Sequence, residues 1–154
     1  MTATGPDQAD DDLAAITATP LAKLAGGLLI GLGAFDAVLA LQSWLLLVRA
    51  PVPALLLVLS MIAAAPVCVF LGWKVARLYG WASLAGSAAA GVTGVVALSW
   101  ALFAFFNGVV ALLAFALVPL SLAASVVSGL CIDAGRRADA ARERLRDQGL
   151  EAGI

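Results

Sequence analysis

The stretch that most constrains this chain runs from Leu24 to Val48 and is almost wholly apolar. It contains no Lys or Arg, and its one ionisable side chain, Asp36, lies at its middle. Roughly 20 apolar residues in a helix suffice to cross the hydrocarbon core of a bilayer. Because this stretch exceeds that length, we expect a membrane-spanning helix that can tilt. Thr19 is expected to cap its N-terminus, with Pro20 at the first helical position.

Composition places the whole chain in the same class. Its 154 residues are 63% hydrophobic and 12% charged, whereas a soluble domain is roughly half apolar and a quarter charged. We therefore expect an all-α polytopic membrane protein, a four-transmembrane-helix bundle with short loops. Pro51 and Pro53 are expected to end the first span in a tight turn. The predicted transmembrane domain covers residues 20–132, with spans at about 21–48, 54–73, 81–106 and 109–132.

The two ends of the chain are polar. Residues 1–19 are acidic and too poor in apolar side chains to order themselves, so we expect a flexible tail with at most a short turn over Leu13–Ile16. Residues 133–154 carry five arginines interleaved with acids. They are expected to form a charged helical tail that extends the last span into the cytoplasm.

The basic residues predict the orientation. Lys23, Lys74, Arg77 and the five tail arginines fall on one side of the predicted spans, and only Arg49 falls on the other. By the positive-inside rule, both termini lie in the cytoplasm. Usage rich in Ala, Leu, Gly and Arg is typical of a high-GC bacterium, so we expect a multi-pass protein of the inner (plasma) membrane.

Asp36 is the most unusual residue in the predicted membrane core. A carboxylate at the bilayer centre costs roughly 2.5–3.5 kcal/mol on insertion scales, so we expect it to be protonated and to face the protein interior. Counting from the span ends places Thr93 and Ser121 at its depth and Ser60 slightly outward. Two hypotheses follow: a structural acid held by these hydroxyls, or a proton or cation site made of Asp36, Thr93, Ser121 and Ser60.

Small residues form stripes along the predicted spans, as expected where helices approach closely in lipid. The first span carries Gly26 and Gly33, with Gly27 and Gly31 on a neighbouring face. The third span carries an unbroken stripe at alternating spacings of four and three: Ser83, Ser87, Ala90, Gly94, Ala97 and Ala101. We expect these faces to pack the bundle. A spare face, such as Gly27/Gly31 or Gly86/Gly91, would dock a second copy or another subunit.

No catalytic pattern stands out. The chain has no His, which excludes His-ligand zinc sites and His-based triads, and Cys68 and Cys131 form no C-x-x-C motif. We expect no catalytic residue, metal, cofactor or nucleic-acid partner. The leading hypothesis is a non-enzymatic membrane protein that works as a homo-oligomer or as an accessory subunit of a membrane complex. The alternative is a small proton- or cation-coupled transporter or channel that uses Asp36. An enzyme built on Asp133, Arg136 and Arg137 has least support.

Overall fold

The computed structural model describes residues 6–17, 19–43, 51–103 and 108–147. Every element in these ranges is a helix, which confirms the all-α prediction for the described part of the chain. The helices are α1 (Pro6–Ile16), α2 (Pro20–Ser43), α3 (Pro51–Ala76), α4 (Gly80–Phe103), α5 (Gly108–Leu130) and α6 (Ile132–Asp147).

Four of these helices, α2 to α5, are long and apolar enough to cross a membrane. Their outer surfaces carry large apolar side chains that a soluble protein would bury. Examples with half or more of the side chain exposed are Leu24, Leu41, Leu56, Phe70, Val95, Leu102, Leu112 and Val126. Large apolar side chains therefore lie on the outside of all four helices as well as the inside, a surface that suits a membrane protein.

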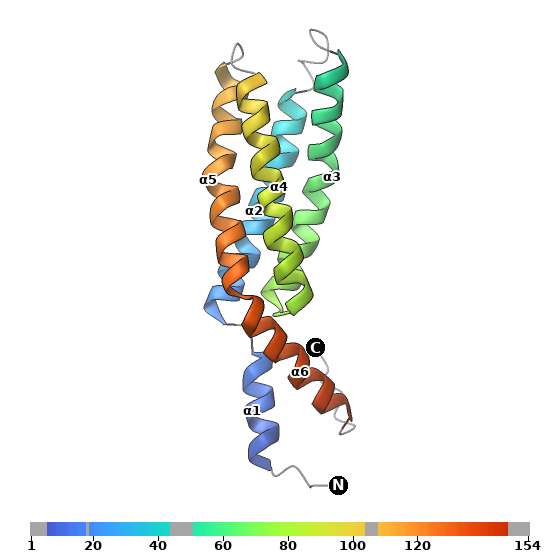
Figure 1. The fold of residues 1–154 in the computed structure, drawn as a ribbon, viewed down its shortest axis with the longest axis vertical. Helices are drawn as coiled ribbons and strands as arrows, with labels where there is room; N and C mark the ends of the chain where they lie inside the picture. Colours follow the sequence, from blue (N-terminus) through green and yellow to red (C-terminus); the bar gives the residue numbers. More distant parts are fainter. Residues whose placement is uncertain (1–5, 18, 44–50, 104–107, 148–154) are drawn as a thin grey trace.

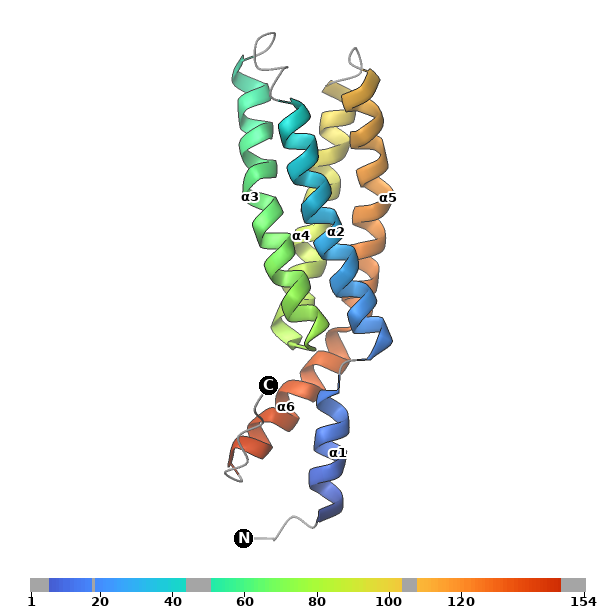
Figure 2. The same cartoon turned by 180° about the vertical axis from the view of Figure 1, so that it is seen from behind.

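The four long helices lie side by side (Figure 1). α2 packs against α3 and α5, α4 packs against the same two helices, and α2 and α4 make few contacts with each other. The α3–α4 turn lies at the same end as the start of α2 and the end of α5 (Figure 2). α1 and α6 lie beyond that end and pack against each other.

Prolines begin three of the helices, at Pro6, Pro20 and Pro51. The Thr19 hydroxyl accepts a hydrogen bond from the Ala22 N–H at 3.2 Å, so the expected cap at the start of α2 is present. α3 begins at Pro51 rather than at residue 54. The amides of the first helical turn have no intrahelical partner, so Pro51 and Pro53 lose nothing there and start a helix instead of only closing a turn. The predicted ends of the first and third spans, 44–48 and 104–106, lie outside the described residues.

The N-terminal prediction of a flexible tail differs from the structure, which has a helix over Pro6–Ile16. Ile16 is buried against Ala141 and Leu145 of α6. The Asp12 carboxylate, almost fully buried, pairs with the Arg144 guanidinium at 2.9 Å. Composition alone suggested disorder because the partner surface lies more than a hundred residues away in the sequence.

The C-terminal tail is helical over Ile132–Asp147, but this helix does not continue the last span. The helix is interrupted by a turn at Cys131, and α6 runs at an angle to α5 (Figure 1). α6 also has a small apolar face that its many charges obscure in the sequence: Gly135, Ala138, Ala141 and Leu145 are buried. This face covers α1 and the start of α4, so α6 is packed against the protein instead of being solvated all round.

The α3–α4 turn is a Schellman-type helix ending. The Leu78 N–H donates to the Val75 carbonyl at 2.9 Å, and the Tyr79 N–H donates to the Lys74 carbonyl at 3.2 Å. Leu78 has φ of 57°, a conformation that costs a non-glycine residue about 1–2 kcal/mol. Its side chain is buried in the core, which contributes about 1.5–3 kcal/mol and offsets that cost.

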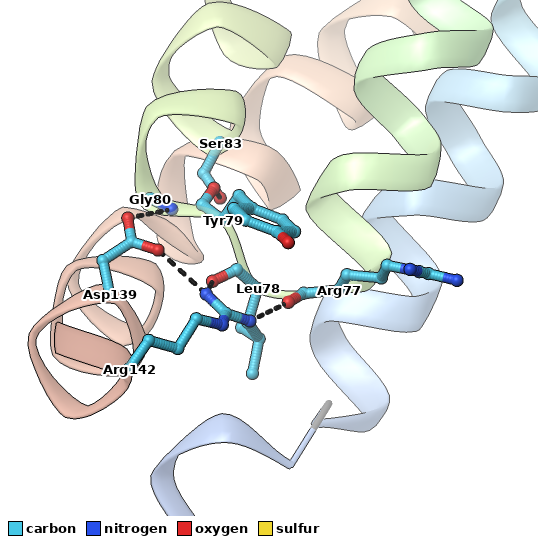
Figure 3. A network of polar contacts seen from close by, with 7 residues as sticks. All are labelled: Arg77, Leu78, Tyr79, Gly80, Ser83, Asp139 and Arg142. Atoms are coloured by element: carbon cyan, nitrogen blue, oxygen red, sulfur yellow. Dashed lines mark hydrogen bonds and ion pairs between the residues drawn. The ribbon is translucent and has the colours of Figure 1, made fainter. Parts of the chain in front are cut away.

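Two side chains of α6 bind this turn from outside (Figure 3). The Asp139 carboxylate accepts a hydrogen bond at 2.8 Å from the N–H of Gly80, the first residue of α4. The Arg142 guanidinium donates to the Leu78 carbonyl at 3.0 Å, to the Arg77 carbonyl and to Asp139 at 2.8 Å. An acid thus meets a helix N-terminus and a base meets a helix C-terminus, as the helix dipoles favour.

Candidate functional site

Close approach of α2 and α3 positions Asp36. A Cβ atom on Gly33 would lie only 2.6 Å from the Ala65 carbonyl oxygen, and one on Gly26 only 2.5 Å from the Gly72 carbonyl oxygen. Glycine is therefore required at both places for the two backbones to meet. Asp36 lies one turn beyond Gly33 on the same buried face of α2, and none of its surface is exposed.

A cavity of about 70 Å³ lies beside the Asp36 carboxyl group. α3 and α4 form its side walls, and α2 supplies only Asp36. The lining residues are Asp36, Ser60, Met61, Ala64, Val92, Thr93 and Val96. The lining residues of α3 and α4 lie near the middle of their helices, and Asp36 lies about two-thirds of the way along α2, so the cavity is near mid-depth in the group of four helices.

Neither carboxyl oxygen of Asp36 has a hydrogen-bond partner among the residues that the structure describes. The Thr93 hydroxyl lines the same cavity and lies beside the Cys68 thiol of α3. The hypothesis of a structural acid held by Ser and Thr hydroxyls needs contacts that the described residues do not make. A buried polar group without a partner is rare in proteins and calls for a specific explanation.

The structure gathers three of the four residues of the predicted site. Asp36, Ser60 and Thr93 line the cavity. Ser121 does not line it: its hydroxyl donates to the Val118 carbonyl at 2.8 Å within α5, and its side chain packs against Gly94. Ser121 is therefore separate from the other three predicted residues, because depth along a span does not say which helix faces which.

Sequence reasoning missed Cys68 as a neighbour of this site. Its thiol contacts Thr93 and lies close enough to Asp36 to interact with it electrostatically. The available signal was the fourfold spacing of Ser60, Ala64, Cys68 and Gly72, which predicts one shared face on α3.

The small-residue stripe of α4 faces inward and packs largely on α5. Ser87 and Ser125 exchange hydrogen bonds, each hydroxyl donating to the other residue's carbonyl at 2.9 Å. Gly94 lies against Ser121. The remaining members of the stripe are buried: Ser83, Ala90, Ala97 and Ala101. The Ser87 hydroxyl is thus bonded to α5 and the Ser83 hydroxyl to the Tyr79 carbonyl of the α3–α4 turn, so neither is a partner of Asp36.

The two glycine pairs that were expected to offer spare faces differ. Gly27 and Gly31 are exposed on α2, and a Cβ on either would meet nothing within 4 Å. Gly86 is buried, and a Cβ on it would lie 2.8 Å from the Leu29 side chain. The Gly86/Gly91 face is therefore not free, because α2 already occupies it at Gly86.

The site contains one carboxyl group, either ionised or protonated, beside a small and mostly apolar cavity. Asp36 is the one acidic side chain among the cavity-lining residues, and Ser60 and Thr93 add hydroxyl oxygens. Such a group can take up and release a proton or hold one small cation.

Comparison with protein-family models, curated proteins and solved structures gives no match for this chain.

Proposed function

We propose that the chain is a four-span protein of a bacterial inner membrane, that α2 to α5 form a transmembrane bundle, and that both termini face the cytoplasm. Basic and aromatic side chains gathered at the α3–α4 turn support this orientation. The Lys74 ammonium lies 4.9 Å from the ring centroid of Trp73 and 4.6 Å from that of Tyr79. The Arg77 guanidinium lies 4.3 Å from the Trp73 ring. Such pairs suit the headgroup region, where rings are half-buried and cations reach water.

Within that frame, the protein binds a proton or small cation at Asp36 and transfers it across the membrane, as a small transporter or channel. The observation that carries this proposal is a fully buried carboxyl group, with both oxygens unpaired among the described residues, beside a cavity. A carboxyl group kept only for structure would be hydrogen-bonded. An intramembrane acid costs insertion energy, so its presence is best explained by a ligand that comes and goes.

Two prolines give this region the means to move. Pro66 lies inside α3, close to the cavity-lining residue Ala64, and Pro119 lies inside α5. Each proline removes one helical hydrogen bond, which allows a helix to bend locally. Bending of α3 at Pro66 would change the width of the cavity. The same helix would then both line the site and open it.

Flux measurements in liposomes test this function. The purified protein is reconstituted, a pH or sodium gradient is imposed, and a dye reports proton or cation entry. Asp36→Asn keeps the shape of the side chain and removes the ionisable group, so we expect it to abolish the flux. Ser99→Ala is the matched control, because Ser99 is exposed on α4 and its hydroxyl bonds only within its own helix, to the Val95 carbonyl. Flux that is absent in the parent protein, or unchanged by Asp36→Asn, would rule the function out.

The second candidate is an assembly subunit, either a homo-oligomer or an accessory subunit of a membrane complex. The specific observation in its favour is that α2 uses Gly26 and Gly33 for internal packing while Gly27 and Gly31 lie open. Two exposed glycines four residues apart allow another helix to approach closely.

Oligomeric state tests the second candidate. Gly27→Leu with Gly31→Leu fills the open face with bulky side chains, and we expect it to convert an oligomer into monomers during cross-linking in membranes. Ala123→Leu, at an exposed position on α5, should leave the oligomer intact. If both variants and the parent run as the same species, this face takes no part in assembly.

A further inference from the structure

The side chains around Asp36 restrict which ligand can bind there. Three of the seven cavity-lining residues are polar, namely Asp36, Ser60 and Thr93, and the others are apolar. Hard metal cations such as Ca²⁺ are held by about six or more oxygen atoms. The lining side chains thus offer too few oxygens to replace the hydration shell of a metal ion.

The size of the cavity points the same way. One water molecule occupies roughly 30 Å³ in the liquid, so a cavity of about 70 Å³ holds only a few waters. An organic cation with several carbon atoms does not fit without a large rearrangement. A proton needs no more room than the water that delivers it.

The charges around Asp36 also favour a proton. α4 and α5 carry no Asp, Glu, Lys or Arg in their described ranges, and Lys74 of α3 lies near the helix end. On α2 itself, Lys23 is 13 residues away, which is about 20 Å along a helix. The remaining titratable neighbour is the Cys68 thiol of α3, which brings no positive charge. Among the described residues an ionised Asp36 therefore has no counter-ion nearby, and a bound proton neutralises it completely.

The walls of the cavity indicate a way in. Ser60 on α3 and Val92 on α4 are exposed to the surroundings, while Asp36 on α2 is fully buried behind them. The cavity therefore opens sideways between α3 and α4 at mid-depth, and Asp36 forms its inner wall. A reagent dissolved in the membrane reaches this opening without entering from either end of the helices.

We infer that the ligand bound at Asp36 is a proton, and that the carboxyl group is reached from the side, between α3 and α4 beside Ser60. This inference rests on the proposed function for the choice of site and narrows its ligand from proton or cation to proton. Transport is not needed for its test, so the two can fail separately.

Labelling with dicyclohexylcarbodiimide tests the inference, because this membrane-soluble reagent modifies protonated carboxyl groups in apolar surroundings. The full chain in liposomes is treated at several pH values, with and without added sodium, potassium or lithium ions. Peptide mass spectrometry then gives the fraction of Asp36 modified. We expect modification that falls as the pH rises, since deprotonation removes the reactive form. We expect the metal ions to have no effect, and a water-soluble carbodiimide to modify Asp36 far more slowly.

A pair of variants tests the entrance. Ser60→Phe places a ring at the opening and should slow the labelling of Asp36 by about tenfold, which corresponds to ~1.4 kcal/mol of added barrier. Leu59→Phe is the matched control, because Leu59 is the exposed neighbour on the same helix and does not line the cavity. Equal elution of the two variants and the parent on size exclusion shows that each is folded.

Each contrary result overturns a defined part of the inference. Protection of Asp36 by a metal ion would show a cation site instead of a proton site. Modification that is absent, or independent of pH, would show that Asp36 does not exchange a proton. Faster labelling by the water-soluble reagent, or equal rates in both Phe variants, would show that the entrance lies elsewhere. Normal labelling of a protein that carries no flux would leave the proton site standing and remove the transport function.

Discussion

At the scale of single residues, neighbouring glycines on α2 have opposite roles. A Cβ on Gly26 would lie 2.5 Å from the Gly72 carbonyl oxygen and 2.7 Å from Ala76, whereas a Cβ on Gly27 would meet nothing within 4 Å. We expect Gly26→Ala to destabilise the protein by about 1–3 kcal/mol, because backbone atoms must move apart. Gly27→Ala should be neutral or stabilising by up to about 1 kcal/mol, because alanine favours the helix. Thermal unfolding in detergent, followed by circular dichroism, compares the two. Equal unfolding temperatures would mean that α2 and α3 are not in close contact.

Arg142 gives a second test at this scale. Its guanidinium binds the carbonyls of Arg77 and Leu78 at the end of α3, and its Cζ lies 4.4 Å from the Tyr79 ring centroid. We expect Arg142→Gln to cost about 1–3 kcal/mol, since charge-assisted hydrogen bonds are lost and the carbonyls stay partly buried. Arg146→Gln, at an exposed position on the same helix, should change stability by less than about 0.5 kcal/mol. Similar losses in both variants would indicate that net charge matters more than the turn contact.

At the scale of elements, α1 depends on α6 for its structure. Isolated helices shorter than about 12–15 residues are marginal in water, and α1 has 11 residues. We expect Ile16→Asp to release α1, because a charge would replace an apolar side chain against Ala141 and Leu145. Losing that contact, worth about 1.5–3 kcal/mol, should raise amide hydrogen exchange in α1 by tenfold or more.

Leu13→Asp is the control for this release. Leu13 lies on the same helix with about half of its side chain exposed, at 51%. The substitution adds the same charge without entering the contact with α6, so the exchange rates of α1 should stay near those of the parent. If Leu13→Asp raises exchange as much as Ile16→Asp does, added charge alone unfolds α1 and docking on α6 is not what orders it.

The elements differ in how far the sequence could predict them. Long apolar runs predict α2 to α5 well, because a helix of that length and polarity has one favourable place, the bilayer. The sequence did not predict α1 or the apolar face of α6. The two helices pack against each other, and the apolar periodicity of each is weak when its sequence is considered alone. The same limit applies at the cavity. Counting residues along the spans predicts that Thr93 and Ser121 lie level with Asp36. Helix packing decides that Thr93 of α4 lines the cavity beside Asp36, whereas the Ser121 hydroxyl bonds within α5.

At the scale of the whole molecule, the proposed four spans, an even number, would put α1 and α6 on one side of the membrane. α5 has 23 residues, about 35 Å of helix, which exceeds the roughly 30 Å of a bilayer core. Its first residue, Gly108, then faces one side and its last turn faces the other. Single cysteines at Thr17, Glu143 and Gly108, all exposed positions, test this in a chain whose buried Cys68 and Cys131 are replaced by alanine.

A membrane-impermeant maleimide should label Thr17→Cys and Glu143→Cys only in inverted vesicles, and Gly108→Cys only in intact spheroplasts. The reverse pattern would keep the four spans and overturn the orientation that the basic residues predict. Labelling of Thr17→Cys and Glu143→Cys from opposite sides would leave an odd number of crossings. In that case α2 to α5 could not all span the membrane, and Asp36 could not lie near its centre with α3 and α4 beside it. The proposed proton site therefore depends on this pattern more than on any single contact.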